Sequence, residues 1–160
     1  MKKWKIYLIG GIAILAAVLI LLASVFIPMA MKKSDMGELL AKVQEGDLIS
    51  IYDPLYETGD VLGNKGKEVV LTESELQEIK SLLQAVTNSG YEYRQEKTFM
   101  AGATGLCLKV RIGDKETVHL WLAEREFYQM EGELAICFSA SNKENYTALY
   151  QKAKNLIATK

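Results

Sequence analysis

The residues with the greatest potential for catalysis are one histidine and three acidic residues. His119 is the only histidine in the chain, while Asp53, Glu57 and Asp60 lie in or beside the turn-rich segment PLYETGDVLGNKG. A histidine beside a carboxylate can act as a general base, and clustered carboxylates can hold a metal ion, so an envelope hydrolase or metal-dependent enzyme is one hypothesis. These acidic residues lack the spacing of a calcium-binding loop, and a single histidine defines no catalytic triad. We therefore prefer a non-catalytic function and predict no cofactor and no bound metal.

A second group of residues favours binding. Strict alternation in two neighbouring predicted strands places Lys109, Arg111, His119 and Trp121 on the same, solvent-facing side of a sheet. An aromatic side chain beside cations could bind a protein, peptide or glycan partner. Alternatively, a third layer covers this face, formed by the segment after the apolar run or by the turn-rich segment 54–66, and the sequence favours that interpretation.

The two cysteines, Cys107 and Cys137, fall in different predicted strands. In a simple meander these strands are next-but-one neighbours, so two spacings of about 4.8 Å separate the Cα atoms by about 9–10 Å. That distance exceeds the limit of about 7 Å for a disulfide, and we predict two unpaired thiols. Two distant cysteines and one histidine also lack the paired spacing of zinc ligands.

The net charge of −1 conceals an asymmetry along the chain. Five of the 19 basic residues flank the apolar run, which leaves 14 against 20 acidic residues and a net charge of −6 from residue 34 onward. An acidic domain repels phosphate backbones, so the sequence predicts no nucleic-acid partner. The five flanking basic residues are Lys2, Lys3, Lys5, Lys32 and Lys33.

Residues 6–31 form an uncharged apolar run. As a helix rising about 1.5 Å per residue, the run is about 39 Å long, more than the membrane hydrocarbon core of about 30 Å. The apolar part of a secretory signal has only about 7–15 residues, and Pro28-Met29-Ala30 offers half of the small-residue pair that cleavage needs. We therefore predict an uncleaved transmembrane signal-anchor rather than a cleaved signal peptide.

The basic residues at the two ends of this run predict its orientation. Three lysines precede the run and two follow it, which favours a cytoplasmic N-terminus and a domain on the outer side of the cell membrane. The predicted parts are a cytoplasmic basic tail (1–5), a transmembrane helix (6–31), a juxtamembrane helix or stalk (32–46) and an extracytoplasmic domain (47–160).

Short sequence signals predict the helices. Met36, Leu39, Leu40 and Val43 recur at helical spacing before a glycine, and for this segment we favour a juxtamembrane stalk. Two S/T-x-x-E capping boxes predict the starts of two amphipathic helices. The capping residues are Thr72 with Glu75, in a helix that ends at residues 88–90, and Ser141 with Glu144, in a closing helix.

Alternating segments predict a sheet with one packed face and one wet face. Together with the two helices, this sheet predicts a two-layer α+β domain with a mainly antiparallel sheet. The expected strands are 47–53, 67–71, 91–99, 104–112, 116–123 and a broken strand over 126–130 and 133–140.

This order of features resembles the small, uncharacterised, membrane-anchored ectodomains of Gram-positive bacteria. The resemblance lies in the basic start with its single span and in the segments LTESELQEIKSLL, LCLKVRIGDKETVHLWL and NYTALYQKAKNLI. It implies a cell-envelope protein and assigns no site residues. The sequence thus supports a membrane-anchored binding module with a protein or peptide partner, and the enzyme built from Asp53, Glu57, Asp60 and His119 is the alternative.

Overall fold

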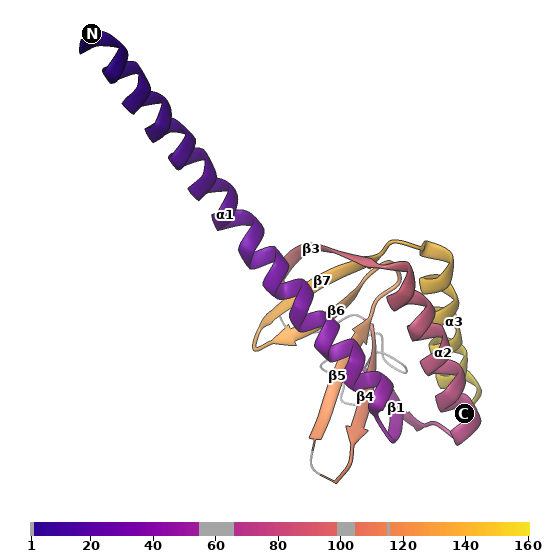
Figure 1. The fold of residues 1–160 in the computed structure, drawn as a ribbon. Coiled ribbons are helices and arrows are strands. Elements are labelled where there is room, and N and C mark those ends of the chain that lie inside the picture. Colours follow the sequence, from indigo (N-terminus) through magenta and orange to yellow (C-terminus); the bar gives the residue numbers. More distant parts are fainter. Residues whose placement is uncertain (1, 55–65, 99–104, 115) are drawn as a thin grey trace. The chain divides into compact units, whose positions relative to one another are not determined.

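The computed structural model describes residues 2–54, 66–98, 105–114 and 116–160, with side chains from Ile14 onward except at Glu116 (Figure 1). The chain divides into two compact units, Met1–Ser34 and Asp35–Lys160. The helices are α1 (Lys2–Glu45), α2 (Glu73–Ser89) and α3 (Lys143–Thr159). The strands are β1 (Leu48–Asp53), β2 (Lys67–Val70), β3 (Tyr91–Thr98), β4 (Leu106–Ile112), β5 (Glu116–Leu122), β6 (Phe127–Glu131) and β7 (Leu134–Ala140).

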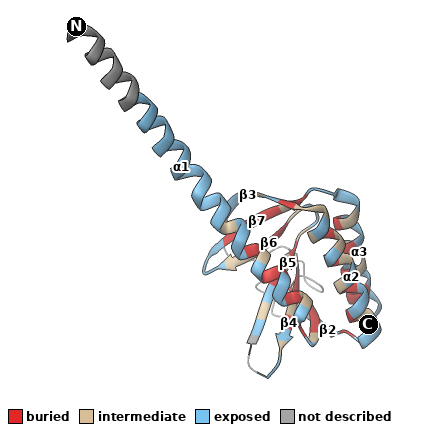
Figure 2. Ribbon diagram, viewed as in Figure 1, coloured by how far each residue is buried: buried red, intermediate tan, exposed pale blue. Residues whose placement is uncertain are grey.

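The first unit is a single stretch of helix. All side chains from Ile14 to Met31 are exposed, and large apolar residues predominate among them (Figure 2). A helix of this length and composition can cross a membrane, where lipid replaces water around its apolar side chains. Pro28 lies inside the helix, as membrane helices tolerate.

The second unit is built on one antiparallel seven-stranded sheet with the order β2-β1-β4-β5-β6-β7-β3. Strands β4 to β7 follow one another as a meander, with Gly113 and Gly132 at positive φ in the tight turns. The three strands that precede this meander in the chain lie at its two edges, β1 and β2 on one side and β3 on the other. This α+β architecture confirms the predicted fold class.

One face of the sheet and all three helices share a single hydrophobic core. The alternating strand residues that face inward include Ile51, Leu108, Leu120 and Phe138, each at most 1% exposed. The buried residues of α2 are Leu76, Ile79, Leu83 and Val86, and those of α3 are Tyr146, Leu149, Ala153, Leu156 and Ile157.

The last turns of α1 belong to this core. Met36, Leu39, Leu40 and Val43 are 0–7% exposed, and Figure 2 shows these turns as alternately buried and exposed. The sequence favours a stalk for this segment, whereas the structure gives it the packing of a core helix. The reason is the apolar stripe itself, which removes its surface from water by packing on the sheet.

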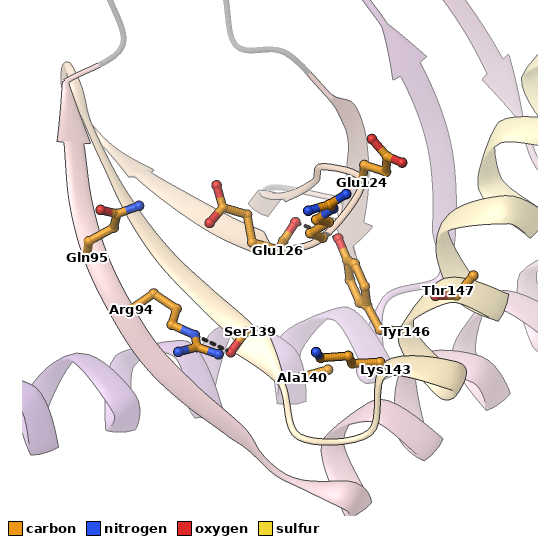
Figure 3. Close-up of a pocket in the computed structure, with 10 residues that line it drawn as sticks. Arg94, Gln95, Glu124, Glu126, Ser139, Ala140, Lys143, Tyr146 and Thr147 are labelled. Carbon is orange, nitrogen blue, oxygen red and sulfur yellow. Dashed lines mark hydrogen bonds between the residues drawn. The ribbon is translucent and has the colours of Figure 1, made fainter.

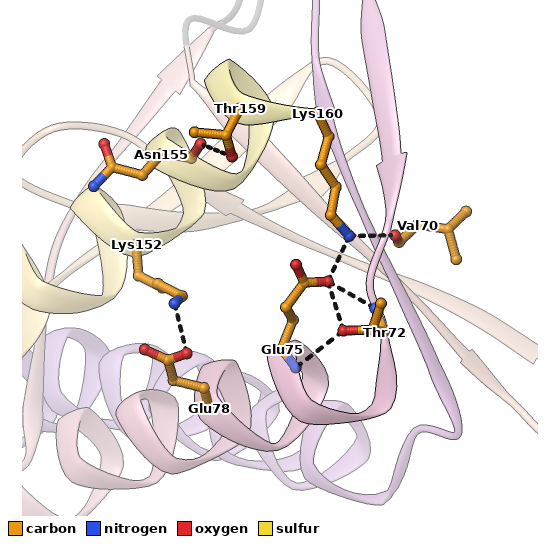
Figure 4. A network of polar contacts seen from close by, with 8 residues as sticks. All are labelled: Val70, Thr72, Glu75, Glu78, Lys152, Asn155, Thr159 and Lys160. Carbon is orange, nitrogen blue, oxygen red and sulfur yellow. Dashed lines mark hydrogen bonds and ion pairs between the residues drawn. The ribbon is translucent and has the colours of Figure 1, made fainter.

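The predicted caps are confirmed for α2 and differ for α3. Thr72 and Glu75 form the predicted capping box, and Glu75 also pairs with Lys160 at 2.5 Å (Figure 4). The N-cap of α3 is Asn142 rather than Ser141. Its side-chain oxygen accepts hydrogen bonds from the amides of Glu144 and Asn145, at 3.0 and 3.2 Å.

Candidate functional site

The face of the sheet opposite the helices, called here the second face, carries a row of residues in cross-strand register. The row runs through Tyr52, Cys107, Trp121, Tyr128 and Cys137, each paired with the next across neighbouring strands. Directly opposed side chains lie close enough to interact. The second face therefore has its own small packed cluster, separate from the main core.

The aromatic part of this row is partly packed within the domain. The rings of Trp121 and Tyr128 stack with centroids 5.9 Å apart and an interplanar angle of 9°. Trp121 is half-buried against a cluster that contains Ala135 and Cys137, and burial raises the pKa of Tyr128. Part of the tryptophan ring thus supports the second face, and the rest of it reaches solvent.

Cys107 is buried, although the alternation of the strand predicts that it lies on the solvent-facing side. It is only 2% exposed, because Tyr52 and Trp121 flank it in the register. Burial raises the pKa of its thiol to about 12, and burial also raises the pKa of Cys137.

Both cysteines are free, as predicted. Their strands are further apart than the sequence suggests. Two strands, β5 and β6, lie between Cys107 on β4 and Cys137 on β7. Three inter-strand spacings amount to about 14 Å, well beyond the reach of a disulfide.

A small polar network surrounds Lys109 on the second face. Its ammonium lies 2.8 Å from Glu68 and 4.5 Å from the ring centroid of Tyr52, and the Ser50 hydroxyl donates to Glu68 at 2.6 Å. These hydrogen bonds, first from Lys109 and then from Ser50, lower the pKa of Glu68. Lys109 is thus largely engaged within the domain.

The structure brings the four predicted binding residues together on the second face. Lys109 pairs in register with His119, and Arg111 lies two residues further along the same strand. Arg111 and His119 are exposed, whereas Lys109 and Trp121 are half-buried. The surface offered to solvent therefore includes part of Trp121, the His119 imidazole two residues away on β5, and the Arg111 guanidinium further along the hairpin.

The structure does not bring together the two described residues of the alternative enzyme hypothesis, Asp53 and His119. Asp53 ends β1 and lines a cleft with Tyr150 of α3, on the helix side of the sheet, whereas His119 lies on the second face. Glu57 and Asp60 lie outside the described residues. Among the residues that the structure describes, no three histidine, cysteine or acidic side chains are grouped as metal ligands.

A cleft that the sequence does not reveal lies where β6 begins late. Phe127, the first residue of β6, pairs with Phe138, so the last two residues of β7, Ser139 and Ala140, extend past their neighbour. The gap forms a cleft of about 600 Å³, bounded by the β5–β6 connection and the first turns of α3 (Figure 3). Its other lining residues are Arg94, Gln95, Glu124, Arg125, Glu126, Lys143, Tyr146 and Thr147.

Polar contacts fix the walls of this cleft. Tyr146 directs its hydroxyl to the carbonyl oxygens of Ala123 and Glu126, each at 2.5 Å, and burial raises the pKa of Tyr146. The Glu126 side chain forms an ion pair with Lys97. A neighbouring cleft of about 650 Å³ shares residues 124–126 and is also lined by Lys154.

The second unit is thus an α+β domain with a helix-covered core face and a partly open second face. Comparison of the chain with known protein families, with characterised proteins and with solved structures found no match. The function is therefore inferred from the chemistry of its own surfaces.

Proposed function

We propose that the chain is a single-pass protein of the cell membrane whose α+β domain is a non-catalytic binding module on the outer side. The helix that precedes the domain is long and apolar enough to span a bilayer. Three lysines on its N-terminal side against two on the other support a cytoplasmic N-terminus. The domain then belongs to the cell envelope.

The observation that carries this proposal is the unequal use of the two faces of the sheet. The three helices all pack on one face, and none of the described helices packs on the other. On that second face Trp121, His119 and Arg111 all reach solvent, and aromatic and arginine side chains are enriched in protein-binding surfaces. The partner is a protein or peptide that presents acidic groups to Arg111.

The separation of Asp53 from His119 supports a function without catalysis. A general base needs its partners within hydrogen-bonding reach. Asp53, however, lies on the helix side of the sheet, whereas His119 lies on the second face.

Site-specific photocrosslinking in intact cells tests the binding surface. A photoreactive amino acid replaces His119, which is exposed on the second face, and in a matched control it replaces Ser81, which is exposed on α2. We expect a discrete crosslinked product from position 119 and none from position 81. The same product from both positions, or none from either, would contradict the proposal.

Two substitutions then rank the contributions to binding. Trp121→Ala should weaken partner capture far more than His119→Ala, because binding energy concentrates in large aromatic side chains. Since Trp121 also stacks on Tyr128, the thermal stability of both variants must be measured in parallel. An enzymatic turnover that is abolished in His119→Ala, while Trp121→Ala mostly alters substrate affinity, would instead support the enzyme hypothesis.

External protease tests the topology. Protease added to intact cells should remove the chain beyond about Lys33, whereas protection of the domain would place it in the cytoplasm.

A further inference from the structure

We propose that the cleft beside Ser139 and Ala140 binds the carboxylate group of a small organic or peptide ligand. This site adds a second binding function to the proposed module and does not depend on the surface around Trp121. It is called here the carboxylate cleft.

Three cations from three separate elements converge on the carboxylate cleft. They are Arg94 of β3, Arg125 of the β5–β6 connection and Lys143 of the first turn of α3. Figure 3 shows the Arg94 guanidinium and the Lys143 ammonium on either side of Ser139. Arg94 donates through Nε to the Ser139 hydroxyl at 2.7 Å, which orients the guanidinium and leaves its terminal nitrogens for a ligand.

These cations are not neutralised within the described part of the chain. No described acidic side chain forms an ion pair with Arg94, Arg125 or Lys143. Of the two acidic residues in the lining, Glu126 is already paired with Lys97. The cleft therefore holds positive charge that an anionic ligand can compensate.

The charge and the geometry of the lining suit a carboxylate. Because Glu126 is paired with Lys97, the remaining charged residues of the lining leave a net charge of +2, which the negative charge of a carboxylate compensates in part. The planar guanidinium of Arg94 also matches the geometry of a carboxylate, with two parallel hydrogen bonds.

The remaining walls suit an organic ligand with an apolar body. Ala140, the ring of Tyr146 and the side chain of Thr147 line the cleft, and the Tyr146 hydroxyl is already engaged by two backbone carbonyls. The volume of about 600 Å³ lies within the range of about 300–1,000 Å³ for small-molecule sites. Asn142 occupies the amides of Glu144 and Asn145, so recognition falls to side chains rather than to the helix terminus.

A matched pair of probes tests the charge that is recognised. Isothermal titration calorimetry on the full chain in nanodiscs compares N-acetyl-leucine with N-acetyl-leucinamide, which differ only in the terminal carboxylate. We expect the acid to bind at least about tenfold more tightly than the amide, because charge-assisted hydrogen bonds to the cations are lost with the amide. Equal affinities, no binding of the acid at millimolar concentration, or equally tight binding of inorganic phosphate would each overturn the proposal.

A second pair of probes distinguishes the source of the carboxylate. A short peptide that ends in leucine is titrated with a free and with an amidated C-terminus. Tighter binding of the free peptide than of N-acetyl-leucine identifies a peptide terminus as the ligand, and equal binding identifies a small free carboxylate; both results support the carboxylate cleft.

Variants locate the site on the surface. Arg94→Gln and Lys143→Gln should each weaken binding of the acid about tenfold and leave binding of the amide unchanged. Both side chains are exposed, so the variants should keep the melting temperature of the wild type. Lys42→Gln, which removes an exposed cation of α1 that does not line the cleft, is the control, and a loss of affinity in this variant as large as in Arg94→Gln would overturn the assignment.

Discussion

Replacing Leu40 by alanine tests whether the end of α1 is a structural part of the domain. Leu40 is 1% exposed and belongs to the main core cluster. The substitution removes three carbon atoms, at about 0.8 kcal/mol each, and leaves a cavity that adds to this loss. We therefore expect Leu40→Ala to lower the free energy of unfolding by about 3 kcal/mol, which corresponds to a fall in melting temperature of about 10 °C for a domain of this size.

The fluorescence of Trp121 provides the assay, because its stacking on Tyr128 is lost when the domain unfolds. The only other tryptophan, Trp4, is replaced by phenylalanine in all variants. Glu38→Ala, at an exposed position of the same helix, is the control and should change stability by less than about 0.5 kcal/mol. An effect of Leu40→Ala as small as that of the control would show that residues 35–45 behave as a stalk after all.

Three further predictions concern single groups. Thr72→Ala should lower stability by about 1 kcal/mol in a denaturant titration, since it removes the acceptor for the Glu75 amide, and an unchanged midpoint would refute the capping role. The hydrogen bonds from Lys160 first, and then from Thr72, lower the pKa of Glu75 from 4.5 to about 2, so its stabilising effect is complete above pH 4.5 and is lost as the pH falls towards 2. Between pH 4.5 and about 2, Glu75→Gln should accordingly lose less stability than the wild type. Acid-unfolding curves that run parallel for the two proteins would show that Glu75 is not the source of this pH dependence. A thiol-reactive dye should label neither Cys107 nor Cys137 in the folded protein and both in denaturant, because the thiols are buried; rapid labelling of the folded form would disprove it.

The elements that the sequence predicts well are those specified by nearby residues. Alternation places Leu108 and Val110 in the core without knowledge of their partners, because successive strand residues face opposite sides. The Thr72 capping box likewise depends on residues three positions apart. The start of α3 was ambiguous at the same local level, since Ser141 and Asn142 can both cap a helix, and only backbone geometry selects Asn142.

The features that the sequence does not predict depend on distant partners. The stripe that contains Met36 and Leu40 shows that one face of a helix is apolar, but not that this face packs on the sheet of the following domain. The alternation also cannot show that Cys107 is shielded by Tyr52, a residue from another strand.

The candidate sites follow the same division. The sequence places Lys109, Arg111, His119 and Trp121 on one face, and the structure agrees, because the two strands form a hairpin. The carboxylate cleft escapes sequence analysis, because Arg94 and Lys143 lie far apart in the chain. The cleft opens because β6 begins only at Phe127, while its partner β7 continues to Ala140.

The order of strands in the sheet also constrains how the domain is made. The chain is synthesised from its N-terminus at about 5–20 residues per second, yet β1 pairs with β4, and β3 pairs with β7, the last strand to appear. Strands β1 and β2 can pair with each other early, whereas β3 must wait without its partner until β7 has been translated. Strand β3 is suited to this delay, since Glu92, Arg94 and Glu96 keep it hydrated and discourage aggregation of the nascent chain. The sheet is thus completed only after β7 emerges, and a chaperone that holds the growing polypeptide would act on β3.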